Sequence, residues 1–229
     1  MNFLAHAAPL LFGGEADAYE VAGVAVPDWL GVAARRVKCR SKHAALFADH
    51  PDRPLAGVAR GVMRHHADDG WFHESRAFGE LSLDFARQLR VKLGDDSGMR
   101  PWFVGHILVE MLLDASLDRA RPGLLDQYYS VVARVDPQRV GDAVQRMCGR
   151  EVPRLPECVE RFLSIGFLRD YRTDEGLLFR LNQVMRRVGL SALPPSVLPL
   201  LASFRAEVSA NRERLLSPPA AGPRRAHVA

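Results

Sequence analysis

Two stretches of this 229-residue chain place histidine and carboxylate side chains four residues apart. Residues at positions i, i+4 and i+8 lie on one face of a helix, so each stretch would present its polar side chains as a stripe. The two stripes are His65, Asp69 and His73, and His106, Glu110 and Asp114. A metal site in a helical bundle needs imidazoles and carboxylates that converge from adjacent helices. We therefore predict that these six residues are metal ligands.

The second stripe interrupts residues 102–117, which are otherwise nearly all apolar. A helix that is apolar on most sides is a buried one. A buried carboxylate is costly unless it is paired or coordinates a cation. Arginine ion pairs would also satisfy these acids, and each histidine taken alone could be an exposed or a core side chain. Six residues of ligand type in two stripes favour a metal site over these alternatives.

Two residues outside the stripes are candidate further ligands, namely His6 and Asp28. Mixed imidazole and carboxylate ligation suits Mn, Fe, Zn or Mg better than Cu(I), and we expect one or two divalent ions of Mn, Fe or Zn per chain. Histidine ligands usually donate their second ring N–H to an acceptor. Asp68 or Glu74 could be that acceptor for the histidines of the first stripe.

The side chains around the stripes are those that phosphoester hydrolysis would use. Metal ions generate hydroxide from bound water near neutral pH and polarise a phosphoryl oxygen. One guanidinium group can bind two phosphate oxygens at once, which makes Arg64 and Arg100 candidate catalytic residues. Arg172 is as well explained by a surface ion pair. His66 lies about 100° around the helix from the first stripe and is a candidate general acid.

The elements that must position these residues are helical by their apolar periodicity. Helices are expected at residues 55–73, 81–91, 102–117, 123–133, 137–148, 155–168, 173–188 and 196–215. Prolines 101, 122, 137 and 156 stand where helices should begin, and glycines 94, 149 and 189 where they should end. Residues 13–20 and 39–54 read as loops. We predict an all-α, single-domain bundle of about eight helices over residues 1–216, and a disordered tail at 217–229.

The composition excludes several classes of protein. An apolar fraction of 48% and a charged fraction of 25% are those of an ordinary globular chain rather than a disordered or fibrous one. The net charge of +4 comes from scattered arginines without a basic stripe, so we expect no nucleic-acid partner. Three widely spaced cysteines, the absence of a long apolar run and a non-basic start favour a cytoplasmic protein without a membrane span.

Several short motifs follow one another along residues 1–190. They are Met-Asn-Phe-Leu-Ala-His at 1–6, the segment 23–29 that ends in Asp-Trp, Gly-Val-Met-Arg-His at 61–65 followed by Asp69, Phe78, Leu-Arg-Asp-Tyr at 168–171, then Leu181, Met185 and Arg-Arg at 186–187. In this order they resemble the acyl carrier protein phosphodiesterase family, all-helical metal-dependent hydrolases related to the HD phosphohydrolases. The family has a loop where this chain has residues 23–29. His73 and the pair His106 and Glu110 stand where the family has aspartates.

The resemblance implies an HD-phosphohydrolase-like fold, a metal such as manganese, and release of 4'-phosphopantetheine from holo-acyl carrier protein in fatty acid biosynthesis. The partner would be that acidic protein, docked on an arginine-rich rim, or a small phosphoester. One alternative is a metal-binding or non-catalytic helical scaffold whose site has drifted. A di-metal oxidase is a further alternative, but such bundles use Glu-x-x-His pairs that this sequence does not provide on two helices.

Overall fold

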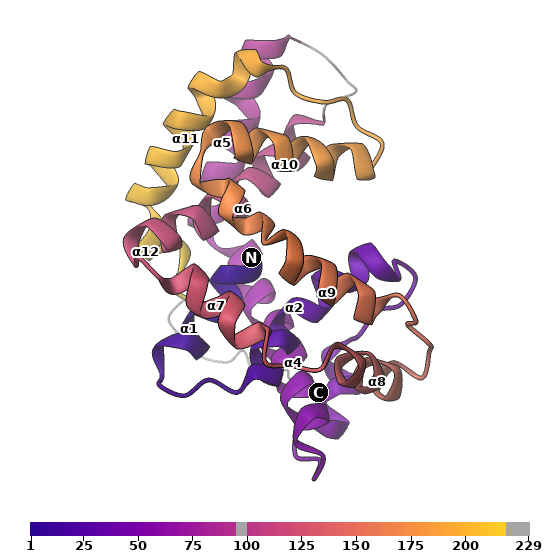
Figure 1. Ribbon diagram of the computed structural model, residues 1–229. Helices are drawn as coiled ribbons and strands as arrows, with labels where there is room; N and C mark the ends of the chain where they lie inside the picture. Colours follow the sequence, from indigo (N-terminus) through magenta and orange to yellow (C-terminus); the bar gives the residue numbers. More distant parts are fainter. Residues whose placement is uncertain (95–99, 219–229) are drawn as a thin grey trace, which may run out of the picture.

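The computed structural model of the protein describes residues 1–94 and 100–218 (Figure 1). Within these ranges all regular structure is helical, which confirms the all-α prediction. The α-helices are α1 (Phe3–Phe12), α2 (Ala18–Ala33), α3 (Ser41–Ala44), α4 (Arg53–Glu74), α5 (Arg76–Leu93), α6 (Pro101–Ala120), α7 (Leu124–Val132), α8 (Pro137–Cys148), α9 (Leu155–Ile165), α10 (Asp174–Arg187), α11 (Leu198–Ala210) and α12 (Arg212–Leu215). Three short 3-10 segments are η1 (Ala45–Phe47), η2 (Phe167–Arg172) and η3 (Pro195–Val197).

Helices α2 and α4 pack closely along each other because glycines lie where they meet. A Cβ atom added at Gly23 would lie 2.6 Å from the carbonyl oxygen of Val58, and one added at Gly61 would collide with the backbone oxygen of Glu20. Any side chain at either position would push the two backbones apart. This contact fixes α4 against α2 one helical turn before His65.

Helices α5 and α6 form a second close pair. A Cβ atom added at Gly105 would collide with the backbone oxygen of Ser82 on α5, so the two backbones touch there. The next residue along α6 is His106, whose position the contact therefore sets. The apolar side chains of α6, such as Leu108 and Leu112, are fully buried, as the sequence predicts for this helix.

The N-terminus lies in the middle of the molecule (Figure 1), where α1 contacts α2, α6 and α7. Asp114 of α6 accepts hydrogen bonds from the backbone N–H groups of Leu4 and Ala5, at 3.1 and 2.8 Å. The first N–H groups of a helix have no partner within it, so a buried acceptor from another helix satisfies them. Asp114 thereby anchors the helix that carries His6.

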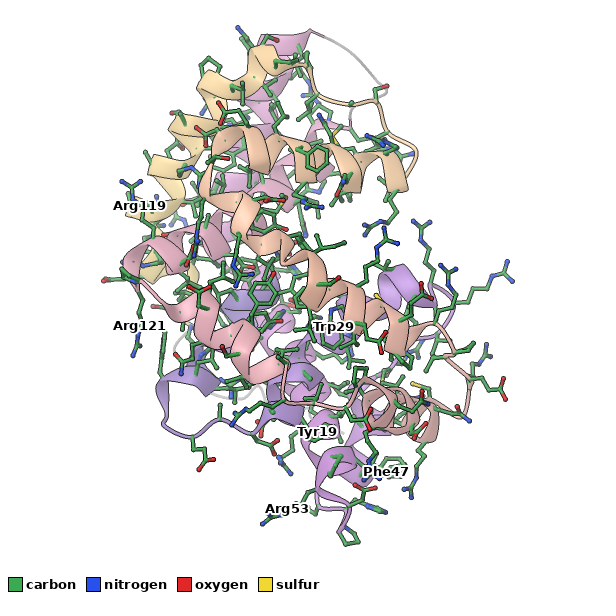
Figure 2. All side chains as sticks on the ribbon, in the orientation of Figure 1. Tyr19, Trp29, Phe47, Arg53, Arg119 and Arg121 are labelled. Carbon is green, nitrogen blue, oxygen red and sulfur yellow. The ribbon has the colours of Figure 1, made fainter. Side chains whose placement is uncertain are left out.

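Aromatic side chains fill the core between the helices. Trp29, near the centre of Figure 2, lies edge-on to Phe162 of α9 with ring centroids 5.4 Å apart. On α11, Phe204 stacks on Phe85 of α5 at 3.9 Å. Buried apolar residues from Met1 to Leu215 form one connected cluster, so α1 through α12 share a single core.

The helices expected after residue 53 occur close to the predicted bounds, with two interruptions. The helix expected at 155–168 ends at Ile165, because Gly166 adopts a left-handed φ of 58° and η2 follows. The helix expected at 196–215 is broken at Asn211 into α11 and α12. The described ranges contain twelve α-helices, so the predicted count of about eight is too low. Of the tail predicted at 217–229, residues 219–229 lie outside the described part of the chain.

The first third of the chain departs most from the prediction. The loop that the family resemblance implies at residues 23–29 is wrong, because α2 continues through Pro27 to Ala33. The loop predicted at 13–20 ends early, where the Asp17 carboxylate accepts from the N–H of Tyr19 and begins α2, and the loop at 39–54 contains α3 and η1. Helices α1 and α2 are nearly all apolar and contain internal prolines. They therefore lack the polar face on which helical periodicity is recognised.

Candidate metal centre

The first cluster of ligand-type side chains joins α1 to α4 and consists of His6, His65 and Asp69, which we call the inner group. The Nε2 atoms of His6 and His65 each lie 3.3 Å from a different carboxylate oxygen of Asp69. The two imidazole rings are stacked with their centroids 4.2 Å apart. Both histidines are buried, and the three ligand atoms lie within 4.8 Å of one another. The group has the types and spacing of atoms that one cation needs.

The opposite ring nitrogen of each inner histidine has its own acceptor. Nδ1 of His65 lies 2.8 Å from the carbonyl oxygen of Val24, and Nδ1 of His6 lies 3.3 Å from Asp68. Because a carbonyl oxygen can only accept, His65 carries its hydrogen on Nδ1 and leaves Nε2 free to bind a cation. Asp68 orients His6 rather than the histidines of its own helix, which corrects the sequence prediction. Arg64, a predicted catalytic residue, reaches Asp68 with Nε at 3.7 Å.

The second cluster joins α4 to α6 and consists of His73, His106 and Glu110, the outer group. The Nε2 atoms of His73 and His106 lie 2.9 and 3.3 Å from the same oxygen, Oε1 of Glu110. Both rings pack against Phe78, with centroid distances of 5.0 and 4.8 Å. The side chains of the two histidines are 34% and 30% exposed, so solvent reaches this group directly.

A cationic group connects the two clusters. The α-ammonium of Met1 donates to Asp69 at 2.6 Å and to Glu110 at 3.2 Å. Burial disfavours its charged form, but the charges of Glu110 and Asp69 outweigh burial and raise the pKa of this ammonium. Positive charge is therefore strongly favoured between the two carboxylates. Sequence reasoning did not find this contact, because a backbone amine carries no side-chain signature.

Both carboxylates are held in the ionised form. Burial would raise the pKa of Asp69, but the adjacent imidazoles of His6 and His65 and the charge of the Met1 ammonium lower it well below its usual range. Burial likewise opposes ionisation of Glu110, and hydrogen bonds from His106 and His73 bring its pKa down to about 2. Each cluster thus offers one full negative charge and two imidazole rings, which is a suitable ligand set for a divalent cation.

Unsatisfied polar atoms at the same place also fit a cation. Seven side-chain atoms of the described residues are buried without a hydrogen-bond partner, and two of them, Nε2 of His6 and Oδ2 of Asp28, lie at this place. Burial raises the pKa of Asp28, and the nearby charges of His65 and His6 offset this only in part. Buried polar atoms normally have partners, and a cation at this place would give partners to these two. Asp28 lies beside the inner group without belonging to it.

Three other predicted site residues have different roles in the structure. Asp114 enters neither group, because its carboxylate is occupied by the N–H groups at the start of α1. Nε2 of His66 lies 2.7 Å from the carbonyl oxygen of Cys39, so this ring holds the segment after α2 instead of facing the carboxylates. Arg100 is exposed at the N-terminus of α6, with a left-handed φ of 48°, about 9 Å along the helix axis from His106.

A cavity of about 490 Å³ borders the outer group through Glu110 and is also lined by Met1 and Asp28. Its walls are apolar side chains from α2, α6, α9 and η2. Four arginines also line it: Arg154, Arg161, Arg180 and Arg187. Arg180 pairs with Asp170 at 2.6 Å, and no other ion pair in the described residues engages these four. The cavity therefore suits a ligand that has both an anionic and an apolar part.

Comparisons of the chain with protein-family models, with curated proteins and with solved structures found no match. None of the helices in the described ranges is long and apolar enough to cross a membrane. The chemistry of the centre therefore rests on its own geometry.

Proposed function

We propose that this protein is a metal-dependent phosphoester hydrolase whose inner and outer groups hold one or two divalent ions of Mn, Fe or Zn. One observation carries the proposal. Three helices bring two imidazole nitrogens and one carboxylate together twice, beside a cavity lined with arginines. Two histidines and one carboxylate are a ligand set of catalytic zinc sites and of iron(II) sites, and both leave positions open for water and substrate.

The bound ions would supply a hydroxide near neutral pH and polarise a phosphoryl oxygen. The residues of the chain do the remaining work. Val24 and Asp68 keep the inner imidazoles oriented with Nε2 toward Asp69. Arginines of the cavity bind the non-bridging phosphate oxygens, for which their paired N–H groups are suited. Its apolar walls receive the uncharged part of the substrate and exclude water around the phosphoester.

The family resemblance names a more specific substrate. It suggests that the protein releases 4'-phosphopantetheine from holo-acyl carrier protein, or cleaves a related phosphoester, on an HD-phosphohydrolase-like fold. An acidic carrier protein would dock on the rim of the cavity, where Arg154, Arg161 and Arg187 are available. Such docking would weaken as the salt concentration rises, because it depends on exposed charges. A small phosphoester makes fewer charged contacts, so its binding would weaken less steeply with salt.

The ligand set supports a second candidate function. Two histidines and a carboxylate also occur in non-haem iron(II) oxygenases, so each group would suit an iron-dependent oxidation. The arginines of the cavity favour the hydrolase, because an oxygenase has no general need for phosphate-binding groups.

The proposal is tested by loading metal-stripped protein separately with Mn, Zn and Fe(II) and assaying phosphoesters, from bis(p-nitrophenyl) phosphate to holo-acyl carrier protein. We expect His65→Ala and Asp69→Ala each to abolish phosphodiesterase activity while circular dichroism shows unchanged helicity. His50→Gln, in the loop before α4, is the matched control and should retain activity. Unchanged turnover in both ligand variants would refute the site. Less than about 0.2 equivalents of bound metal, with none taken up on titration, would favour a non-catalytic scaffold.

A further inference from the structure

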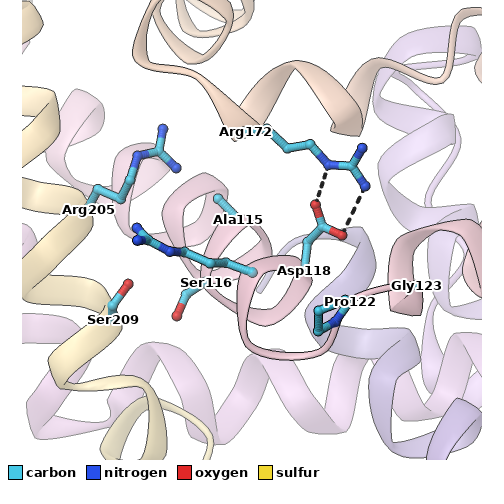
Figure 3. Close-up of a pocket in the computed structure, with 9 residues that line it drawn as sticks. Ala115, Ser116, Asp118, Pro122, Gly123, Arg172, Arg205 and Ser209 are labelled. Atoms are coloured by element: carbon cyan, nitrogen blue, oxygen red, sulfur yellow. Dashed lines mark hydrogen bonds and ion pairs between the residues drawn. The ribbon is translucent and has the colours of Figure 1, made fainter.

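A second cavity, of about 390 Å³, lies away from the metal centre, between the C-terminal half of α6, η2 and α11 (Figure 3). None of the inner or outer ligands lines it. The polar side chains that face it come from α6, η2 and α11, and they are Ser116, Asp118, Arg119, Arg172, Arg205 and Ser209. Three guanidinium groups and two hydroxyls thus border one small space with a single carboxylate.

Two of these arginines are held in place with N–H groups to spare. Arg172 binds Asp118 through Nε at 2.6 Å and Nη2 at 3.2 Å, as the dashed lines in Figure 3 show, and its Nη1 has no part in this pair. Arg205 binds Asp174 through Nε and Nη2, and the carbonyl oxygen of Tyr171 through Nη1. A guanidinium has five N–H donors, so each arginine keeps at least two after these bonds. The bonds fix the direction of the remaining donors.

The cavity also has an excess of positive charge. Asp118 is 7% exposed and is matched by Arg172, while Asp174 matches Arg205. Arg119 has no carboxylate partner within the described part of the chain. Its charge therefore remains to attract an anion into a space that already contains oriented N–H donors and the hydroxyl of Ser209.

We propose that this cavity is a second binding site, for a small phosphorylated anion such as inorganic phosphate or a phosphomonoester. Oxygens of a tetrahedral dianion can accept from guanidinium groups that approach from three different elements, which a flat carboxylate does less well. The volume accommodates a phosphate with a small organic group attached. The site needs no metal and does not depend on the proposed hydrolase activity.

The test is isothermal titration calorimetry of the full chain with inorganic phosphate and with glycerol phosphate, at constant ionic strength. In metal-stripped protein we expect a site that Arg119→Gln weakens about tenfold and that Ser209→Asp weakens further by placing a negative charge among the donors. Any phosphate bound by the arginines of the other cavity is a separate site. Arg119 is exposed, so its replacement leaves the fold intact. Thermal unfolding followed by circular dichroism verifies that both variants are folded.

Two control variants make the result specific. Arg121→Gln removes the same charge two residues along, on the same edge of the molecule (Figure 2), where the guanidinium lies over the ring of Phe12 at 4.2 Å. Arg161→Gln removes a charge from the other cavity. Each should leave the affinity of the site that Arg119→Gln weakens within about twofold of the unmodified protein.

The proposal is overturned by any of four results. The first is no binding up to about 10 mM phosphate, and the second is an equal loss of phosphate affinity in Arg119→Gln and Arg121→Gln. The third is a loss of affinity in Arg161→Gln without one in Arg119→Gln. The fourth is binding of succinate as tight as that of phosphate. The second result would mean that diffuse surface charge attracts phosphate, and the third that phosphate binds in the other cavity. The fourth would mean that the cavity binds anions in general.

Discussion

The inner and outer groups contain the same types of ligand but differ in what holds them. The inner histidines are buried, and His65 and His6 each direct Nδ1 to a fixed oxygen, from Val24 and from Asp68. The outer histidines are about one-third exposed and are held mainly by contact of their rings with Phe78. Identical side-chain chemistry thus gives one rigid cluster and one looser cluster in the same molecule.

This difference predicts an order of metal binding. Ligands that are already fixed lose less conformational entropy when they bind an ion, and hydrogen bonds to the opposite ring nitrogen raise the basicity of a histidine. The inner group should therefore bind the first ion tightly. The outer group, through Glu110, borders the cavity and should bind a second ion that exchanges more readily.

The largest expected effect comes from removing one carboxylate charge at a time. Asp69→Asn should lower the affinity for the first Mn or Zn ion about a thousandfold, because both inner imidazoles face that charge. Glu110→Gln should leave the first ion within about threefold and eliminate the second. Competition with a chelator of known affinity measures both constants. Loss of both ions in either variant would mean that the two groups form one inseparable site.

The next effect concerns the helix contact that positions the inner group. Gly61→Ala forces a methyl group against the backbone of α2, so we expect it to lower the free energy of unfolding by about 3 kcal/mol and to weaken the first ion. Gly70→Ala, on the same helix with open space around it, is the matched control and should raise stability by up to about 1 kcal/mol. Urea unfolding compares the two. A Gly61→Ala protein as stable as the control would refute the contact.

The spacing of residues in the sequence predicts which side chains share a face but not how they divide into sites. Eight residues of helix span about 12 Å, so His65 and His73 cannot bind the same ion. Asp69 belongs to the inner group because it contacts His6 of α1, and His73 belongs to the outer group because it contacts Glu110 of α6. The stripe in α6 is divided in the same way. Glu110 faces the outer histidines, and Asp114, one turn on, meets the N-terminus of α1 instead.

Other parts of the site were beyond sequence reasoning because backbone groups supply them. The carbonyl oxygen of Val24 orients His65, and the ammonium of Met1 bridges Asp69 and Glu110. Neither group depends on the type of side chain at its position. In the sequence, Gly61 and Gly70 are both isolated glycines of one predicted helix. Only the position of α2 shows that Gly61 lies at a helix contact and that Gly70 does not.

A third prediction concerns the pH dependence of stability and involves Asp114. This residue anchors α1, which carries the inner histidine His6, and belongs to neither group. Burial raises the pKa of Asp114 from 3.8 to about 7, although hydrogen bonds from Leu4 and Ala5 lower it in part. The folded protein therefore keeps a proton that the unfolded chain releases above about pH 4. This contribution to stability is complete at low pH, is lost as the pH rises toward 7, and amounts to about 2 kcal/mol between pH 5 and 7.

Asp114→Asn has no such proton to keep, so its free energy of unfolding should fall less steeply over the same pH range. Urea unfolding of both proteins at pH 5, 6 and 7 measures the two slopes. The remaining titrating groups contribute equally to both, and the difference between the slopes isolates Asp114. Parallel slopes would show that Asp114 is ionised in the folded protein.

The smallest effect tests whether orientation alone distinguishes the two groups. Asp68→Asn keeps an oxygen near Nδ1 of His6 but removes the charge, so it should weaken the first ion about tenfold and leave the second unchanged. Glu74→Gln removes an exposed carboxylate from the same helix and should change neither. In a His6→Ala protein, Asp68→Asn should then have no further effect, because Asp68 acts through that ring. If Asp68→Asn weakened both ions equally, the difference between the groups would come from burial and not from hydrogen bonds to the inner histidines.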